Sequence, residues 1–216
     1  MLRPPPHVFD PLPLKEQLFI RALLFSAPLA AVASRVAGAK VADIGCGHGV
    51  LSALLLVDHP DRRIVGVDPD PRKIAWARAS VGRLPNTHFL VGTAEDLARA
   101  EPGSFDAVVV TDVLYLLPVD AWAGFLRTCR TLLAPGGRLL LKEAEDDGSW
   151  RAKKTLLQER LMVSLLERTR ASGAIGFSSR ERIGAALREA GCGVREIVPL
   201  GKGYTTPHVL FIAQAV

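Results

Sequence analysis

The chain has 216 residues, of which 49% are apolar and 23% charged, a composition typical of one globular domain that needs no disulfide or metal for its core. Its three cysteines are scattered, without a CxxC or Cys/His cluster, which argues against a structural zinc site and favours a reducing, cytoplasmic compartment. The formal net charge of +5 is mildly basic, and because the basic residues are spread out we interpret them as a solvated surface.

The first 37 residues differ from the rest. Five prolines among the first thirteen residues exclude a regular helix and predict a draped arm, and residues 14–36 read as a helix that breaks near Pro28. Residues 22–34 have the apolar character of a signal-peptide core, but the charges at their start and Pro28 favour a helix pair that packs on the domain. The stretch is also too short to span a bilayer, so no transmembrane segment is expected. We therefore predict an N-terminal arm and helices, residues 1–37, that form a lid or cap.

A regular alternation of strand-like and helix-like segments follows. Helical segments are predicted at 50–57, 72–81, 94–100 and 119–133, between apolar runs of strand length at 41–44, 64–67, 88–91, 107–111 and 138–141. Strands that alternate with helices indicate βαβ units, and right-handed crossovers then give a doubly wound parallel sheet covered on both faces.

The pattern changes near the end of the chain. Residues 150–170 read as a long helix, and Ser178 with Glu181 predicts a capping box before a helix at 180–190 that ends at Gly191. The runs 194–199 and 208–214 read as a hairpin, so the last strand should be antiparallel. The predicted fold class is therefore α/β, with a doubly wound, mostly parallel, seven-stranded sheet, an antiparallel last strand and helical lid additions. The main domain spans residues 38–216, with a helical insertion at 150–171.

A glycine-rich loop follows the first predicted strand. Gly45, Gly47 and Gly49 stand at alternate positions, and Asp43 lies two residues before the first of them. A dinucleotide site requires GxGxxG, but the third position here is Val50, and the phosphate-binding GxxxxGK[ST] is absent. The loop is therefore not built for a pyrophosphate.

The motif DxGxGxG at the end of a first strand resembles that of the class I S-adenosylmethionine-dependent methyltransferases, and the resemblance extends from about residue 38 to 143. It implies a Rossmann-like fold and S-adenosylmethionine as the cofactor, with S-adenosylhomocysteine as the product. By this resemblance Asp43 places the methionine ammonium group, and the glycines let the backbone approach the ligand closely. The loop positions of the predicted cofactor site are Gly45, Cys46, Gly47 and Gly49.

The resemblance continues at the ends of the following strands. It implies that Asp68 binds the ribose hydroxyls and that Pro69 lies against adenine. After the third and fourth strands, the residues implied at the adenine ring and beside the sulfonium are Ala94, Glu95, Asp96 and Thr111. The alternative is that single aspartates among these are only polar turn residues and caps.

The sequence does not identify a catalytic residue. In-line methyl transfer needs a general base only where the acceptor must lose a proton. Tyr115 and Glu143 are weak candidates near strand ends, with ordinary packing as the alternative, and His48 is interpreted as an exposed loop residue. His208 has no partner that the sequence identifies. The acidic run 143–147 is interpreted as solvated, so no metal site is predicted.

The lid segments are rich in Leu, Ala and Phe, which favours a small, apolar or amphipathic acceptor molecule. The alternatives are an RNA methyltransferase and a non-catalytic protein that binds S-adenosylmethionine. The [DNS]PP[YFW] motif of enzymes that methylate amino groups in nucleic acids is replaced by residues 111–114, which speaks against DNA and disfavours RNA. The chain is expected to be a monomer or a homodimer.

Overall fold

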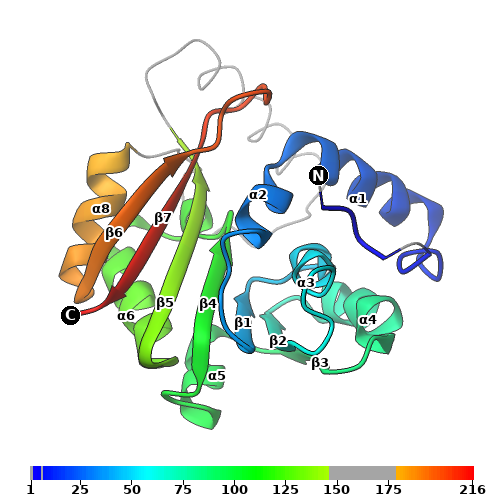
Figure 1. Cartoon of the computed structure of the whole chain (residues 1–216), viewed down its shortest axis with the longest axis horizontal. Helices are drawn as coiled ribbons and strands as arrows, with labels where there is room; N and C mark the ends of the chain where they lie inside the picture. Colours follow the sequence, from blue (N-terminus) through cyan, green and yellow to red (C-terminus); the bar gives the residue numbers. More distant parts are fainter. Residues whose placement is uncertain (1, 6, 146–178) are drawn as a thin grey trace.

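The computed structural model describes residues 2–5, 7–145 and 179–216 of the chain. They form a seven-stranded sheet in the order β3-β2-β1-β4-β5-β7-β6 (Figure 1). The strands are β1 Lys40–Ile44, β2 Arg63–Asp68, β3 Thr87–Val91, β4 Phe105–Thr111, β5 Leu133–Ala144, β6 Cys192–Pro199 and β7 His208–Ala215. The first five pair in parallel, whereas β7 runs antiparallel to both β5 and β6. The predicted fold class, including the antiparallel last strand, is confirmed.

Helices cover both faces of the sheet, as expected for a doubly wound fold (Figure 1). On one face, Ile20, Val32 and Leu54 pack with Val109 and Leu140 of the sheet. The helices on this face are α1 Leu14–Ser26, α2 Leu29–Ala33, α3 Val50–Leu55 and α4 Pro71–Ala79. The opposite face, which is built around Val108 and Leu141, is covered by α5 Ala94–Ala100, α6 Trp122–Thr131 and α8 Arg180–Glu189. Short 3-10 helices lie at η1 Val81–Arg83, η2 Leu114–Leu116 and η3 Val119–Ala121.

The N-terminal helices break where proline predicts a break. Helix α1 ends at Ser26, and Pro28 immediately precedes the first residue of α2. Both helices bury apolar side chains against the domain, since Ile20 is 1% exposed and Val32 fully buried. None of the helices in the described part of the chain combines the length and the apolar character that a membrane crossing requires.

Some boundaries differ from the sequence prediction. Strand β5 begins at Leu133, five residues before the predicted start, because Leu133 pairs with Phe105 across a register shift. Helix α6 therefore ends earlier, at Thr131. The N-cap of α8 is Ser179, which makes no side-chain cap hydrogen bond, while Ser178 and the predicted helix at 150–170 lie outside the described residues.

Candidate cofactor and active site

The glycine-rich loop joins β1 to α3 at the carboxyl edge of the sheet. Gly45, Gly47 and Gly49 have φ values of +73°, +54° and +75°, a backbone conformation that favours glycine. The amides of Gly45 and Cys46 donate to the carbonyl of Val67, at 2.8 and 3.0 Å, so the loop is fastened to β2. The chain therefore turns tightly between the first two strands.

The three glycines face different surroundings. A Cβ at Gly45 would lie 2.5 Å from Cγ2 of Val113, and one at Gly49 would lie 3.0 Å from the Phe89 ring. A Cβ at Gly47 would meet no atom within 4 Å. Gly45 and Gly49 therefore allow close packing, whereas Gly47 borders open space that a ligand can enter.

Asp43 offers an unsatisfied negative charge below this loop. Its side chain is 1% exposed, and Oδ2 accepts a hydrogen bond from the Ser52 hydroxyl at 2.6 Å. The other oxygen, Oδ1, is buried without a hydrogen-bond partner. Burial raises the pKa of Asp43 from 3.8 to about 6, and the negative charge of Asp68 adds to this. A cationic ligand group would satisfy the orphaned oxygen, so the site fits the ammonium group of the expected cofactor.

Asp68 stands at the end of β2 and is 5% exposed. Its two oxygens accept hydrogen bonds from the amides of Gly47, at 3.1 Å, and Asp70, at 2.9 Å. Asp68 therefore connects β2 to the glycine-rich loop. The adjacent Pro69 is exposed, and Asp70 caps helix α4.

The residues after β3 serve a local structural purpose. Asp96 and Thr93 form a capping box at the start of α5, in which the Thr93 amide donates to Asp96 at 2.9 Å. Ala94 is buried, whereas Glu95 and Asp96 are exposed. The Gly92 amide donates to the main-chain oxygen of Asp68 at 3.2 Å, which places this turn beside the end of β2.

An ion pair that the sequence analysis missed follows β4. The ammonium group of Lys142 lies 2.6 and 2.5 Å from the two carboxylate oxygens of Asp112. Lys142 is fully buried, and Asp112 has the unusual φ of +55° immediately after Thr111. The only sequence signal for this pair is a lysine at the end of an apolar strand.

Glu143 holds the main chain beyond β4. Its Oε1 accepts hydrogen bonds from the amides of Val113, at 3.0 Å, and Leu114, at 2.8 Å. Burial raises its pKa to about 8, and the charge of Asp112 contributes to this. These contacts give Glu143 a structural task, and they position the 3-10 turn η2, which carries the half-buried Tyr115.

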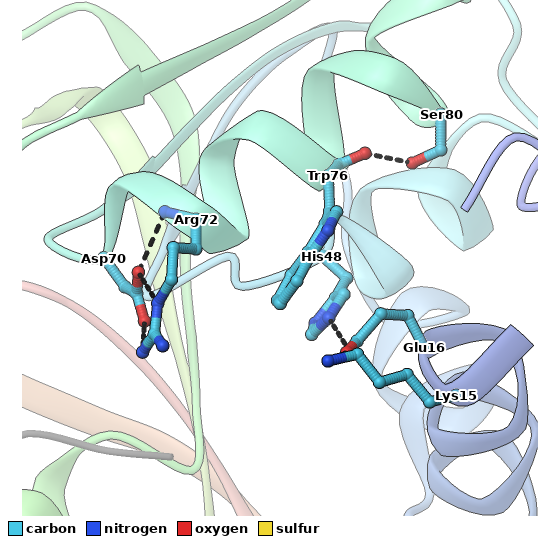
Figure 2. A network of polar contacts seen from close by, with 7 residues as sticks. All are labelled: Lys15, Glu16, His48, Asp70, Arg72, Trp76 and Ser80. Atoms are coloured by element: carbon cyan, nitrogen blue, oxygen red, sulfur yellow. Dashed lines mark hydrogen bonds and ion pairs between the residues drawn. The ribbon is translucent and has the colours of Figure 1, made fainter. Parts of the chain in front are cut away.

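His48 is buried, so its interpretation as an exposed loop residue is wrong. Its ring stacks on Trp76 of α4, with centroids 4.9 Å apart, and its Nε2 lies 3.0 Å from Oε2 of Glu16 in α1 (Figure 2). Glu16 is itself only 2% exposed, and Lys15 lies 3.8 Å from it. His48 is buried because α1, which is distant in the sequence, lies over the glycine-rich loop. His48 therefore links the glycine-rich loop to the N-terminal helix.

Two further polar groups are buried at the edge where β5 and β7 meet. Glu145 is 5% exposed and pairs with Arg180 at the start of α8. The interpretation of the acidic run as solvated is therefore wrong for Glu143 and Glu145, which the fold and ion pairing bury. His208, the first residue of β7, is 7% exposed. Among the described residues neither ring nitrogen makes a well-formed hydrogen bond, although the main chain of Ser26 lies within reach. Among the described residues, no three side chains of metal-ligating type are grouped to hold an ion.

The parallel sheet with its antiparallel seventh strand, together with an acidic, glycine-rich first loop, defines a Rossmann-like methyltransferase fold. The family described as "Methyltransferase domain" matches residues 41–137. The ubiquinone biosynthesis O-methyltransferase of Pseudomonas aeruginosa (strain UCBPP-PA14) is 30% identical over 179 residues, which cover 80% of this chain and 72% of that protein. The chain belongs to the class I S-adenosylmethionine-dependent methyltransferases, whose cofactor is S-adenosylmethionine.

Two other similarities extend the comparison. The ubiquinone biosynthesis O-methyltransferase of Xanthomonas campestris pv. campestris (strain B100) is 40% identical over 113 residues, 51% of this chain and 46% of that protein. The chain thus spans less than half the length of this relative. The structure of the mitomycin 7-O-methyltransferase MmcR superimposes with a TM-score of 0.72 at 24% identity, over 93% of this chain and 57% of MmcR, which shows a shared fold.

Proposed function

We propose that this chain transfers a methyl group from S-adenosylmethionine to a small, apolar or amphipathic molecule. The observation that carries the proposal is the buried Asp43, which has one oxygen without a hydrogen-bond partner among the described residues and directly precedes a loop whose Gly47 borders open space. Bound at this edge, the cofactor supplies a methyl group already activated by the positive charge on its sulfur. The names of the relatives support an acceptor of small-molecule type.

The proposed cofactor-binding residues lie at the ends of successive strands, and each is assigned a part of the cofactor. Asp43 binds the methionine ammonium group, and Asp68 binds the ribose hydroxyls while it holds the loop. The loop residues Gly45, Cys46, Gly47 and Gly49 surround the donor, and the residues assigned to the adenine and sulfonium ends are Pro69, Ala94, Glu95, Asp96 and Thr111. The charges of the site complement a cationic ligand without a phosphate.

Helices α1 and α2 are proposed to cover this site as a cap. Helix α1 contacts the glycine-rich loop through Glu16 and His48 (Figure 2). The helix therefore lies beside the loop that is proposed to bind the cofactor. Exclusion of water from the site would strengthen the electrostatic contacts that orient the reactants.

Calorimetry with S-adenosylhomocysteine tests the proposal. We expect binding to the wild-type chain, no comparable binding of NAD, and an affinity lowered by roughly 1–3 kcal/mol in Asp68→Ala, because hydrogen bonds to a charged acceptor are lost. His88→Ala, at an exposed position of β3, serves as the control. Tighter binding of NAD than of S-adenosylhomocysteine would contradict the proposed function.

A further inference from the structure

His208 lies at the same edge of the sheet as the proposed cofactor site, although it is distant in sequence. Strand β7 is antiparallel to β5, so its first residue stands opposite the carboxyl end of β5, where His208 pairs with Ala144. Adjacent strands lie about 4.8 Å apart, so His208 is two strands, or roughly 10 Å, to the side of β4, and it is two residues beyond the level of Thr111. This separation is comparable to the width of a small acceptor molecule.

His208 also lies on the same face of the sheet as the proposed cofactor site. Alternation along β7 places His208 on the same side as Leu210, which packs in the cluster beneath α1, α2 and α3. Lys142 pairs with Leu210, and Thr111 pairs with Lys142, so all of them follow one face across β4, β5 and β7. Asp43 shares this face, because it pairs with Val109 of the same cluster. His208 and Asp43 therefore lie on one face of the sheet under the cap helices, but at different levels, because Asp43 is level with Leu140 of β5 and His208 is level with Ala144.

The ring of His208 is surrounded by side chains, and at most one of its two nitrogens has a hydrogen-bond partner among the described residues. The Tyr204 ring meets it edge-on, with centroids 6.0 Å apart. The charges of Lys142 and Asp112 act on the ring, and the main chain of Ser26 lies within hydrogen-bonding reach of it. Both ring nitrogens are buried, and neither makes a well-formed hydrogen bond within the described part of the chain. Buried polar groups normally have partners, and Ser26 can satisfy only one of the two ring nitrogens, so we infer that a ligand supplies the partner of the other.

We propose that His208 is a catalytic residue that binds the hydroxyl group of the acceptor and takes up its proton. This inference rests on the proposed function and deepens it, because it assigns the acceptor to the class of hydroxyl compounds, such as phenols. As the acceptor oxygen forms its bond to the methyl carbon, the sulfur–carbon bond breaks and its electron pair stays on sulfur. The O–H proton moves to a ring nitrogen of His208, which becomes positively charged, and it then leaves to solvent.

The surroundings of His208 suit a neutral proton acceptor. Burial lowers its pKa to about 4, and the positive charge of Lys142 lowers it further, whereas Asp112 and the main chain of Ser26 act in the opposite direction. The ring is therefore uncharged at neutral pH. A weak base suffices, because an oxygen that is gaining a methyl group becomes strongly acidic during the transfer. Lys142 would then favour release of the proton.

The test compares an oxygen acceptor with a sulfur acceptor. Catechol must lose a proton on methylation, whereas thiophenol reacts as a thiolate, which is already ionised in mildly alkaline buffer. We expect His208→Gln to lower methylation of catechol by roughly 100-fold or more and methylation of thiophenol by less than about threefold. Equal losses with both acceptors, or unchanged methylation of catechol, would overturn the role of His208.

A second measurement does not depend on turnover. The ring resonances of His208 in isotope-labelled protein, assigned by their absence in His208→Gln, should shift when catechol is added to the complex with S-adenosylhomocysteine. No shift up to the solubility limit of catechol would overturn the inference. The exposed His88, changed to Gln, is the matched control and should alter neither readout. If S-adenosylhomocysteine itself fails to bind, the proposed function fails as well, so the two failures are distinguishable.

Discussion

Asp43 is a buried acid whose pKa of about 6 keeps it partly protonated in mildly acidic solution until a cation binds beside it. Its raised pKa means that the unliganded fold binds a proton more tightly than the unfolded chain does. The stability of the unliganded protein therefore decreases as pH rises from 3.8 to about 6 through this group. The difference corresponds to roughly 3 kcal/mol. A bound ammonium group would recover this free energy, because it stabilises the ionised carboxylate.

The affinity for S-adenosylhomocysteine should consequently depend on pH. Ionised Asp43 is the binding form, so the dissociation constant should increase by roughly tenfold per pH unit below about pH 6 and level off above it. Calorimetry in buffers of different ionisation enthalpy should detect release of a proton on binding near pH 6. In Asp43→Asn, both the proton release and this pH dependence should disappear. A flat profile in the wild type would contradict the proposed contact.

Substitutions at Gly47 and at a matched glycine can separate the effect of backbone strain from the effect of filling the space where the ligand binds. Gly47→Ala should destabilise the fold by roughly 1 kcal/mol, because its φ of +54° disfavours an L-residue, and should also block cofactor binding. Gly103 has a φ of +60° and equally open surroundings, but it precedes β4 at the opposite edge of the sheet. Gly103→Ala should therefore lower the free energy of unfolding, measured in urea, by a similar amount. Its affinity for S-adenosylhomocysteine should be unchanged. Equal affinities in the two variants would remove Gly47 from the site.

Helix α1 is joined to the domain by apolar packing and by polar contacts, of which the pair Glu16 and His48 reaches the glycine-rich loop. Ile20 packs against the core, and Glu16 meets His48 of the glycine-rich loop (Figure 2). Removal of residues 1–36 would therefore uncover core side chains as well as the site. Single substitutions of Glu16 or His48 test the role of α1 as a cap without exposing the core.

Glu16→Gln and His48→Gln should each weaken the binding of S-adenosylhomocysteine and increase hydrogen exchange in residues 14–26, because the loop and α1 hold each other in place. The double variant should lose less binding free energy than the sum of the losses in the two single variants, with a coupling energy of roughly 0.5–3 kcal/mol. Lys15→Ala changes the exposed neighbour of Glu16 and should leave both measurements nearly unchanged. Fully additive losses would show that the two residues act independently.

The elements that the sequence predicts well are those with local signals. The glycine-rich loop and the break at Pro28 depend on backbone preferences within a few residues. The early start of β5 was missed because residues 134–137, Ala-Pro-Gly-Gly, resemble a turn, and only their pairing across the sheet shows otherwise.

At the scale of the whole molecule, the alternation of strands and helices was enough to predict a doubly wound sheet and to place Asp43 and Asp68 at its carboxyl edge. The polar contacts around the site were not predictable in this way. Asp112 and Lys142 are 30 residues apart, and His208 reaches their edge only through the antiparallel pairing of β7. Such contacts depend on strand order and register, which no local pattern encodes.

The position of β7 between β5 and β6 also has a consequence during synthesis. Strands β1 to β5 can assemble from a contiguous piece of chain, but the outer side of β5 needs residues 208–215, which follow β6. Until those residues emerge from the ribosome, the twelve-residue strand β5 has unpaired main-chain groups that attract strands of other nascent chains. Slow translation of the last segment should therefore increase aggregation, and a chaperone that shields strand edges should reduce it.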